Sequence, residues 1–211
     1  MFDSIQKYCL EKVRKIKAPF KRCALKRNDF TIISNNCWGG IVYEAYGLPK
    51  NTPTVGCYFF ADDYLKFVSN LQYYLSIEIK MISVSQSKHQ DDILKLNDDL
   101  NIPIGLLDDI EIVFLHYKTP ELAKEKWLRR VKRVNYNNLI FKFSYQNNCT
   151  DEHLDAFDKM ELKGKKIMFV HRKDLMRHCT VFYPGFENEK QLLNDTRHWD
   201  KYLDVTAFLN S

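Results

Sequence analysis

The most informative absences in this 211-residue sequence are those of the common catalytic and cofactor motifs. It contains no G-x-S-x-G, G-x-G-x-x-G, Walker A or H-E-x-x-H sequence. Lipase-like hydrolases, dinucleotide enzymes, P-loop NTPases and zincins therefore lose their main sequence support. No apolar run reaches the ~18 residues of a spanning helix, and the N-terminus lacks the features of a signal peptide. We expect a cytoplasmic protein.

Paired cysteines are also missing. The six cysteines are scattered, and none forms a C-x-x-C pair. A chain of this length with such spacing matches neither a zinc site nor a disulfide framework. We therefore expect reduced thiols and no bound metal.

Positive charge is concentrated at one end of the chain. Residues 1–30 contain nine Lys/Arg and three Asp/Glu, whereas the other 181 residues contain 23 and 24. A basic segment over residues 1–27 would contact an anionic membrane surface or a polyanionic glycan, which would place the protein at the inner membrane face. The alternative is a solvated helix. Because no basic-aromatic stripe continues into the body, we expect no nucleic-acid partner.

The chain has the composition of a folded protein, with 45% apolar and 14% aromatic residues. Its patterning predicts a basic N-terminal helix within residues 1–19, ending at a break over 17–19, and a single α/β domain over 20–211. Strands are predicted at 30–33, 53–60, 77–84, 102–106, 110–115, 139–143, 166–170 and 179–182. Helices are predicted at 41–46, 64–75, 119–134, 150–160 and 187–194, with a polar insertion or hairpin at 85–101. Strands that alternate with helices predict a three-layer α/β sandwich with a mixed or mostly parallel sheet.

The stretch 30–40 carries the strongest functional signal. Its β-branched strand breaks abruptly into Ser34, Asn35, Asn36 and Cys37, before a short helix. Open α/β proteins bind ligands where strands end in this way. Cys37 is a candidate nucleophile, because a helix N-terminus favours a thiolate. The alternative is that these residues form only a turn and that Cys37 is a small buried residue.

Two further groups would complete a catalytic site. His116 follows an apolar strand and precedes a well-capped helix, so it is the candidate general base on the same sheet edge as Ser34. Ser34 is the alternative nucleophile if a histidine reaches it. On the basic helix, Arg129 and Arg130 would bind phosphates or carboxylates, or belong to a solvated face. His171 follows another strand in a similar position.

Asp62 and Asp63 follow a predicted strand and precede a helix. They would bind a divalent metal beneath a nucleotide-sugar diphosphate, although their spacing is adjacent rather than i,i+2. The alternative is that they cap the helix, because carboxylates are favourable in a first helical turn.

The motifs at residues 33–40, 59–64, 116–117, 126–135 and 148–152 resemble a family of bacterial proteins named for exopolysaccharide biosynthesis. That family is a domain of unknown function found near capsule and lipopolysaccharide genes, and the resemblance spans about residues 20 to 205. The Asn36-Cys37 turn is also similar to the Gly-Asn-Cys-Gln turn of capsule-polysaccharide acetyltransferases that bind coenzyme A. In this sequence Ser34 and Asn35 precede the shared pair, and Trp38 replaces the glutamine.

The resemblance implies a surface-polysaccharide biosynthesis protein, with acyl transfer from acyl-coenzyme A to a glycan or lipid-linked glycan as the first hypothesis. His116 would deprotonate the acceptor hydroxyl, and Cys37 or Ser34 would position or carry the acyl group. The substrate and its oxyanion would contact Asn35, Asn36, Trp38, Gly39, Arg129 and Arg130. The alternatives are a metal-dependent glycosyltransferase that uses Asp62 and Asp63, and a non-enzymatic glycan-binding or assembly partner.

Overall fold

The computed structural model describes residues 14, 16–96, 100–193 and 195–211. Most of the basic segment predicted at the N-terminus lies outside these residues. Residues 16–23 are helical through Pro19, so the break predicted at 17–19 is wrong: one missing amide donor does not end this helix. Within the described ranges, no helix is both long and apolar enough to cross a membrane.

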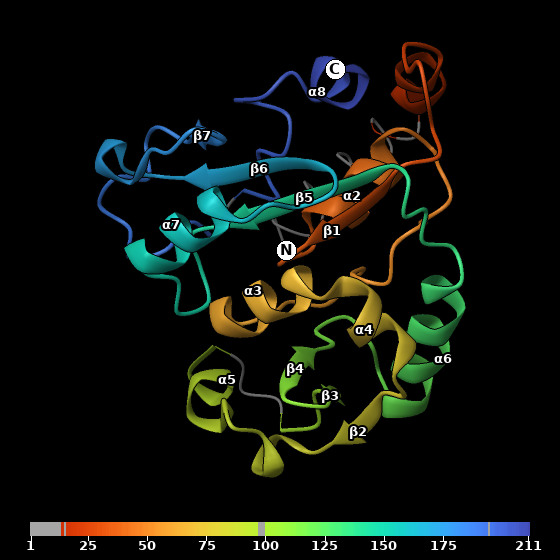
Figure 1. Cartoon of the computed structure of the whole chain (residues 1–211), viewed down its shortest axis with the longest axis vertical. Helices are drawn as coiled ribbons and strands as arrows, with labels where there is room; N and C mark the ends of the chain where they lie inside the picture. Colours follow the sequence, from red (N-terminus) through yellow and green to blue (C-terminus); the bar gives the residue numbers. More distant parts are fainter. Residues whose placement is uncertain (1–13, 15, 97–99, 194) are drawn as a thin grey trace, which may run out of the picture.

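A four-stranded parallel sheet forms the upper half of the molecule in Figure 1. Its strand order is β1-β5-β6-β7, and each neighbouring pair is parallel. The strands are β1 (Thr31–Ser34), β5 (Leu139–Ser144), β6 (Lys165–Val170) and β7 (Thr180–Phe182). All carboxyl ends of the sheet therefore lie along one edge.

Both faces of this sheet carry mainly apolar side chains, and both are covered by helices. Side chains alternate along a strand, so Ile32 and Ile140 face one side while Ile33 and Phe141 face the other. The first side packs on α2 (Trp38–Ala45) and α8 (Val205–Asn210), and the second on α3 (Ala61–Ser69) and α7 (Asp151–Lys159). The predicted three-layer α/β fold with a mostly parallel sheet is confirmed.

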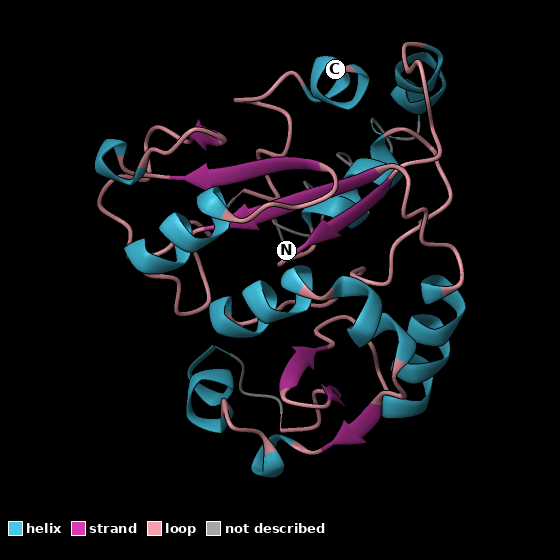
Figure 2. Cartoon of the chain, viewed as in Figure 1, coloured by secondary structure: helices cyan, strands magenta, loops and turns pink. Residues whose placement is uncertain are grey.

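A second, antiparallel sheet lies below α3 in Figure 2. It consists of β2 (Lys80–Ile82), β3 (Ile104–Leu107) and β4 (Ile110–Val113). The β3–β4 turn is Asp108-Asp109, with Asp108 in the left-handed region (φ 54°).

The other elements are α4 (Leu71–Ser76), the 3-10 helices η1 (Val84–Gln86) and η2 (Lys173–Leu175), α5 (Gln90–Leu96) and α6 (Pro120–Val131). The region 85–101, predicted as an insertion, thus contains helical turns.

Two predicted elements are wrong. Residues 53–60 form a loop with one antiparallel bridge, from Tyr58 to Val113, because Pro53 lacks an amide donor and Gly56 turns the chain at φ 71°. Residues 187–193 form turns instead of a helix. There the backbone bonds to the β5 exit loop instead, through Leu192 N to Tyr145 O at 2.8 Å.

Candidate functional site

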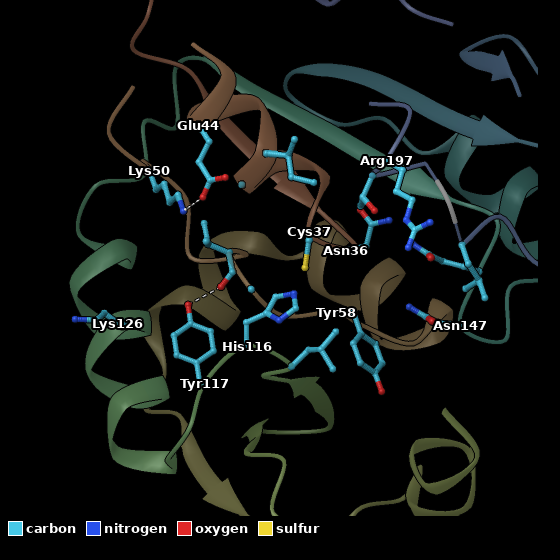
Figure 3. Close-up of a pocket in the computed structure, with 18 of the residues that line it drawn as sticks. Asn36, Cys37, Glu44, Lys50, Tyr58, His116, Tyr117, Lys126, Asn147 and Arg197 are labelled. Atoms are coloured by element: carbon cyan, nitrogen blue, oxygen red, sulfur yellow. Dashed lines mark hydrogen bonds and ion pairs between the residues drawn. The ribbon is translucent and has the colours of Figure 1, made fainter. Parts of the chain in front are cut away.

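A cleft of about 1430 Å³ opens at the carboxyl edge of the parallel sheet (Figure 3). Asn36 and Cys37 line it directly after β1, and Gln146 and Asn147 line it after β5. Since β1 and β5 are parallel neighbours, their exit loops meet at this edge. The cleft therefore lies where the turn after residues 30–33 was predicted to place a ligand.

His116 reaches the same cleft from the opposite wall. We predicted that His116 follows a strand of the same sheet as Ser34. That prediction is wrong, because β4, the strand before His116, belongs to the antiparallel sheet. Its loop is fixed by a hydrogen bond from His116 N to Gly56 O at 3.1 Å. Gly56 has φ 71°, and a Cβ there would lie 3.1 Å from Cε2 of Tyr117, so this close approach requires glycine. His116 and Cys37 thus share one cavity.

The Cys37 thiol does not have the electrostatics of a nucleophile. Burial, reinforced by the negative charge of Asp195, raises the pKa of Cys37 to about 11, although Lys142 acts in the opposite direction. The thiol points toward Cys57 O at 3.9 Å. Desolvation of the buried thiol thus opposes the predicted activation of Cys37 by the helix N-terminus.

Ser34 and Asn35 are structural. Ser34 is fully buried, and its hydroxyl donates to Asn36 Oδ1 at 3.1 Å instead of to a histidine. The Asn35 amide donates to Ser144 O at 3.1 Å and accepts from Ser144 N at 3.0 Å, which extends the β1–β5 pairing by one residue. Neither residue belongs to the described lining of the cleft, so these contacts do not support their predicted catalytic and oxyanion roles.

Asn36 lies on the cleft floor above a group of buried polar side chains. Its Nδ2 donates to both carboxylate oxygens of Asp195, at 3.0 and 2.8 Å. Its Oδ1 accepts from Lys142 Nζ at 2.8 Å and from Trp38 N at 3.1 Å. The Asn36 amide is therefore fully used in holding the floor and does not supply the predicted oxyanion contact.

Lys142, Asp195, Asn36 and Ser144 form what we call the buried charge cluster. Lys142 Nζ and Ser144 Oγ both donate to Asp195 Oδ2, each at 2.5 Å. Burial lowers the pKa of Lys142, whereas the carboxylate of Asp195 acts in the opposite direction. Of these four residues, only Asn36 was predicted from the sequence to belong to the site. The sequence feature that could have revealed the cluster is Lys142, a lysine inside the apolar predicted strand of residues 139–143, because a buried lysine requires a partner.

Trp38 and Gly39 serve the core and not the cleft. Trp38 is fully buried, donates from Nε1 to Trp199 O at 3.1 Å, and packs edge-on against Phe169. A Cβ on Gly39 would lie 3.0 Å from Cγ2 of Ile32, so glycine lets α2 approach β1 closely. Neither Trp38 nor Gly39 belongs to the described lining of the cleft, which includes the glycines Gly40 and Gly56.

Only one of the two predicted arginines reaches the cleft. Arg130 lines it and donates to the hydroxyl of Tyr117, which in turn donates to Val55 O at 2.5 Å. Arg129 is exposed, lies 3.6 Å from Glu125, and is not part of the lining. Among the described residues, the other Lys and Arg side chains of the lining are Arg14, Lys50, Lys126 and Arg197.

Asp62 and Asp63 lie in the first turn of α3, as the helix-capping alternative predicts, and neither lines the cleft. Asp63 is buried and pairs with Lys88 at 2.5 Å and His89 at 2.7 Å. Asp62 pairs with His153 at 2.9 Å. Both carboxylates thus have cationic or imidazole partners. Among the described residues, no group of three or more His, Cys, Asp or Glu side chains is arranged to hold a metal ion.

The family profile of a domain of unknown function, DUF1919, matches residues 9–210, almost the whole chain. The chain belongs to the DUF1919 family. An uncharacterized protein of Haemophilus influenzae is 27% identical to it over 192 residues, which is 87% of this chain and 86% of that protein. The description of DUF1919 assigns no function, so the resemblance to exopolysaccharide proteins stays a prediction.

The cleft of this DUF1919 protein combines three chemical features. Among the described residues of the lining, five Lys/Arg side chains stand against one carboxylate, Glu44, which pairs with Lys50 at 2.5 Å. Lys126 also pairs with Glu125, which is not part of the lining, at 2.9 Å. The exposed His116 supplies an imidazole in the middle of the cleft. The N-terminus of α2 begins at the floor beside Cys37, so its dipole adds partial positive charge there. The arrangement suits a phosphate-bearing ligand next to a proton acceptor.

Proposed function

We propose that this DUF1919 protein is an enzyme of surface-polysaccharide biosynthesis that transfers an acyl group from acyl-coenzyme A to a glycan hydroxyl. The observation that carries the proposal is the excess of cationic side chains around His116. Coenzyme A bears several phosphate charges, and clustered Lys and Arg side chains attract and hold such groups. A cleft of about 1430 Å³ also has room for a donor of that size beside an acceptor.

The proposed reaction is a direct transfer with no acyl-enzyme. The acceptor hydroxyl oxygen attacks the thioester carbonyl while its proton passes to the His116 imidazole. The C–O bond forms, the C–S bond breaks, and the proton moves from His116 to the departing thiolate of coenzyme A. The raised pKa of Cys37 supports this version over a covalent one, because the thiol stays protonated at neutral pH.

Binding of coenzyme A tests the donor half of this proposal. We expect saturable binding by isothermal titration calorimetry that weakens about tenfold or more in Lys126→Gln and Arg130→Gln. Arg129→Gln is the matched control, since it removes the same charge from the same helix outside the cleft. Equal losses in Arg129→Gln and Arg130→Gln would show that general charge, and not the cleft, holds the ligand.

Turnover tests the catalytic half. With a glycan acceptor present, acetyl-coenzyme A should release free thiol, and folded His116→Asn should lose about 10²–10⁴-fold in rate. Cys37→Ala should keep most of the activity. Binding of coenzyme A without turnover on any acceptor would favour the non-enzymatic alternative. Binding of nucleotide sugars in place of coenzyme A would favour a glycosyltransferase, but one that does not use Asp62 and Asp63.

We also propose that the basic N-terminal segment holds the enzyme at an anionic membrane, where a lipid-linked acceptor would lie. Among the described residues, Ile16 and Phe20 are 71% and 77% exposed, one helical turn apart. Exposed apolar side chains within a basic helix are typical of interfacial binding. Flotation with vesicles containing anionic lipid should be lost in Phe20→Glu and should persist in Tyr73→Glu, a substitution of an exposed aromatic residue elsewhere.

A further inference from the structure

The two ends of the cleft differ in chemistry. In Figure 3, Lys50, Lys126 and Tyr117 lie on one side of Cys37 and His116, and Tyr58, Asn147 and Arg197 lie on the other. We call the second group, together with Gln146, the far end. The donor phosphates of the proposed function occupy the first side, so the far end is where the second substrate would lie.

Gln146 is the decisive residue of the far end. Gln146 is one of the residues that line the cleft, it is only 5% exposed, and its buried Nε2 has no hydrogen-bond partner among the described residues. A buried amide nitrogen without a partner is unfavourable, so such groups are rare unless a ligand completes them. The terminal torsion of glutamine is broad, so the amide can rotate to meet a ligand at little energetic cost.

The backbone beside Gln146 is held in an uncommon conformation. Asn147 and Asn148 have φ values of 56° and 62°, in the left-handed region. Asn147 is fixed there by two bonds: its Nδ2 donates to Phe59 O at 3.0 Å, and its N donates to the Gln191 side chain at 2.6 Å. Consecutive left-handed residues that the surrounding structure fixes are typical of functional sites.

The opposite wall of the far end comes from the segment that follows Asp195. Asp195 is anchored in the buried charge cluster, and the next residues, Thr196 and Arg197, line the cleft. The Tyr58 ring supplies an aromatic surface at the same end. An aromatic ring beside amide and hydroxyl groups matches a sugar ring, which has apolar C–H faces and hydroxyls that both donate and accept.

We propose that the far end is a sugar-binding subsite in which Gln146 hydrogen-bonds a hydroxyl of the acceptor glycan. That the ligand is the acceptor glycan rests on the proposed function. That it binds at this end of the cleft rests on the unpartnered amide of Gln146. It puts the sugar on one side of His116 and the phosphate-bearing donor on the other, with the reacting hydroxyl between them.

Saturation-transfer NMR with the full chain tests the subsite. The probes are the methyl glycosides of glucose, galactose and N-acetylglucosamine, and glucuronic acid. We expect at least one probe to bind, and Gln146→Met to raise its dissociation constant by about tenfold, equivalent to about 1.4 kcal/mol. Methionine keeps the length of the side chain and removes the unpartnered amide, so the melting temperature of the variant should not fall.

A comparison of Lys126→Gln with Gln146→Met separates this inference from the proposed function. Lys126→Gln should weaken coenzyme A and leave the sugar unchanged, whereas Gln146→Met should leave coenzyme A unchanged within about twofold. If sugars bind through Gln146 but coenzyme A does not bind at all, the donor assignment fails and the subsite stands. No saturation transfer to any probe, or full sugar affinity in Gln146→Met, would overturn the subsite.

Discussion

Substitution of Lys142 by methionine would remove the cation from the buried charge cluster and leave its anion in place. Methionine fits the apolar stem of the lysine, so the loss is mainly electrostatic. Lys142 and Asp195 are both fully buried, and their 2.5 Å contact excludes water from between them. Asp195 would keep its bonds from Asn36 and Ser144 but lose its counter-charge.

Breaking a buried pair from one side costs about 3–5 kcal/mol, because the remaining charge is desolvated without compensation. That is a large share of the roughly 5–15 kcal/mol by which native domains are stable. The double variant Lys142→Met, Asp195→Asn removes both charges and retains a side chain of the same shape that can bond to Asn36 and Ser144. It should therefore be more stable than Lys142→Met alone.

The free energies of unfolding of the wild type, both single variants and the double variant, measured in urea, form a double-mutant cycle. We expect a favourable coupling energy of about 1–3 kcal/mol between positions 142 and 195. A loss below about 1 kcal/mol in Lys142→Met, or a double variant that loses the sum of the two singles, would refute the reasoning.

Three further predictions concern other parts of the fold. With a pKa of about 11, Cys37 should be alkylated slowly at pH 7, where about one thiol in 10⁴ is ionised. Site-resolved mass spectrometry with iodoacetamide should show the alkylation rate rising with pH until the pH reaches this pKa. Fast labelling at pH 7 would contradict the prediction. Hydrogen bonds from Arg27 lower the pKa of Asp29 from 3.8 to about 2. The stability that the ionised Asp29 adds to the folded state is therefore complete above pH 4 and is lost as the pH falls toward 2. In urea titrations Asp29→Asn should thus cost under about 1 kcal/mol at pH 7 and progressively less in acid, and a constant cost would argue against the pair. A Cβ on Gly105 would clash with the end of the Ile79 side chain and lie 2.8 Å from the Phe114 ring, so Gly105→Ala should lower stability by about 1–3 kcal/mol in thermal unfolding. An unchanged midpoint would show that both side chains can move away.

Local signals in the sequence predicted the elements that depend on neighbouring residues. Helix α6 begins where Thr119 and Pro120 predicted it, with Thr119 Oγ1 accepting from Leu122 N at 3.2 Å. The four strands of the parallel sheet were found for the same reason, because an apolar run between turns is visible without its partner. The exit from β1 does line a cleft, and the binding of a ligand there stays a prediction.

Features that depend on distant residues were not predictable in this way. Nothing in the sequence near Ser34 shows that Asn36 bonds to Asp195, 159 residues away, or that Cys37 is desolvated. The separation of β4 into its own sheet depends on pairing with β3 and on Tyr58, and this changed the route by which His116 reaches the cleft. Gln146 was missed because an unpartnered amide is visible only when its surroundings are known.

The buried charge cluster also imposes an order on the synthesis of the protein. Lys142 and Asp195 are separated by 53 residues, so at about 5–20 residues per second the lysine is synthesised about 3–11 seconds before its partner. During that interval β5 cannot close over its cation without a large cost, and the parallel sheet must stay open or hydrated at its centre. We therefore expect the sheet to close late, when residues 195–199 dock, and chains shortened before Asp195 to remain sensitive to proteases.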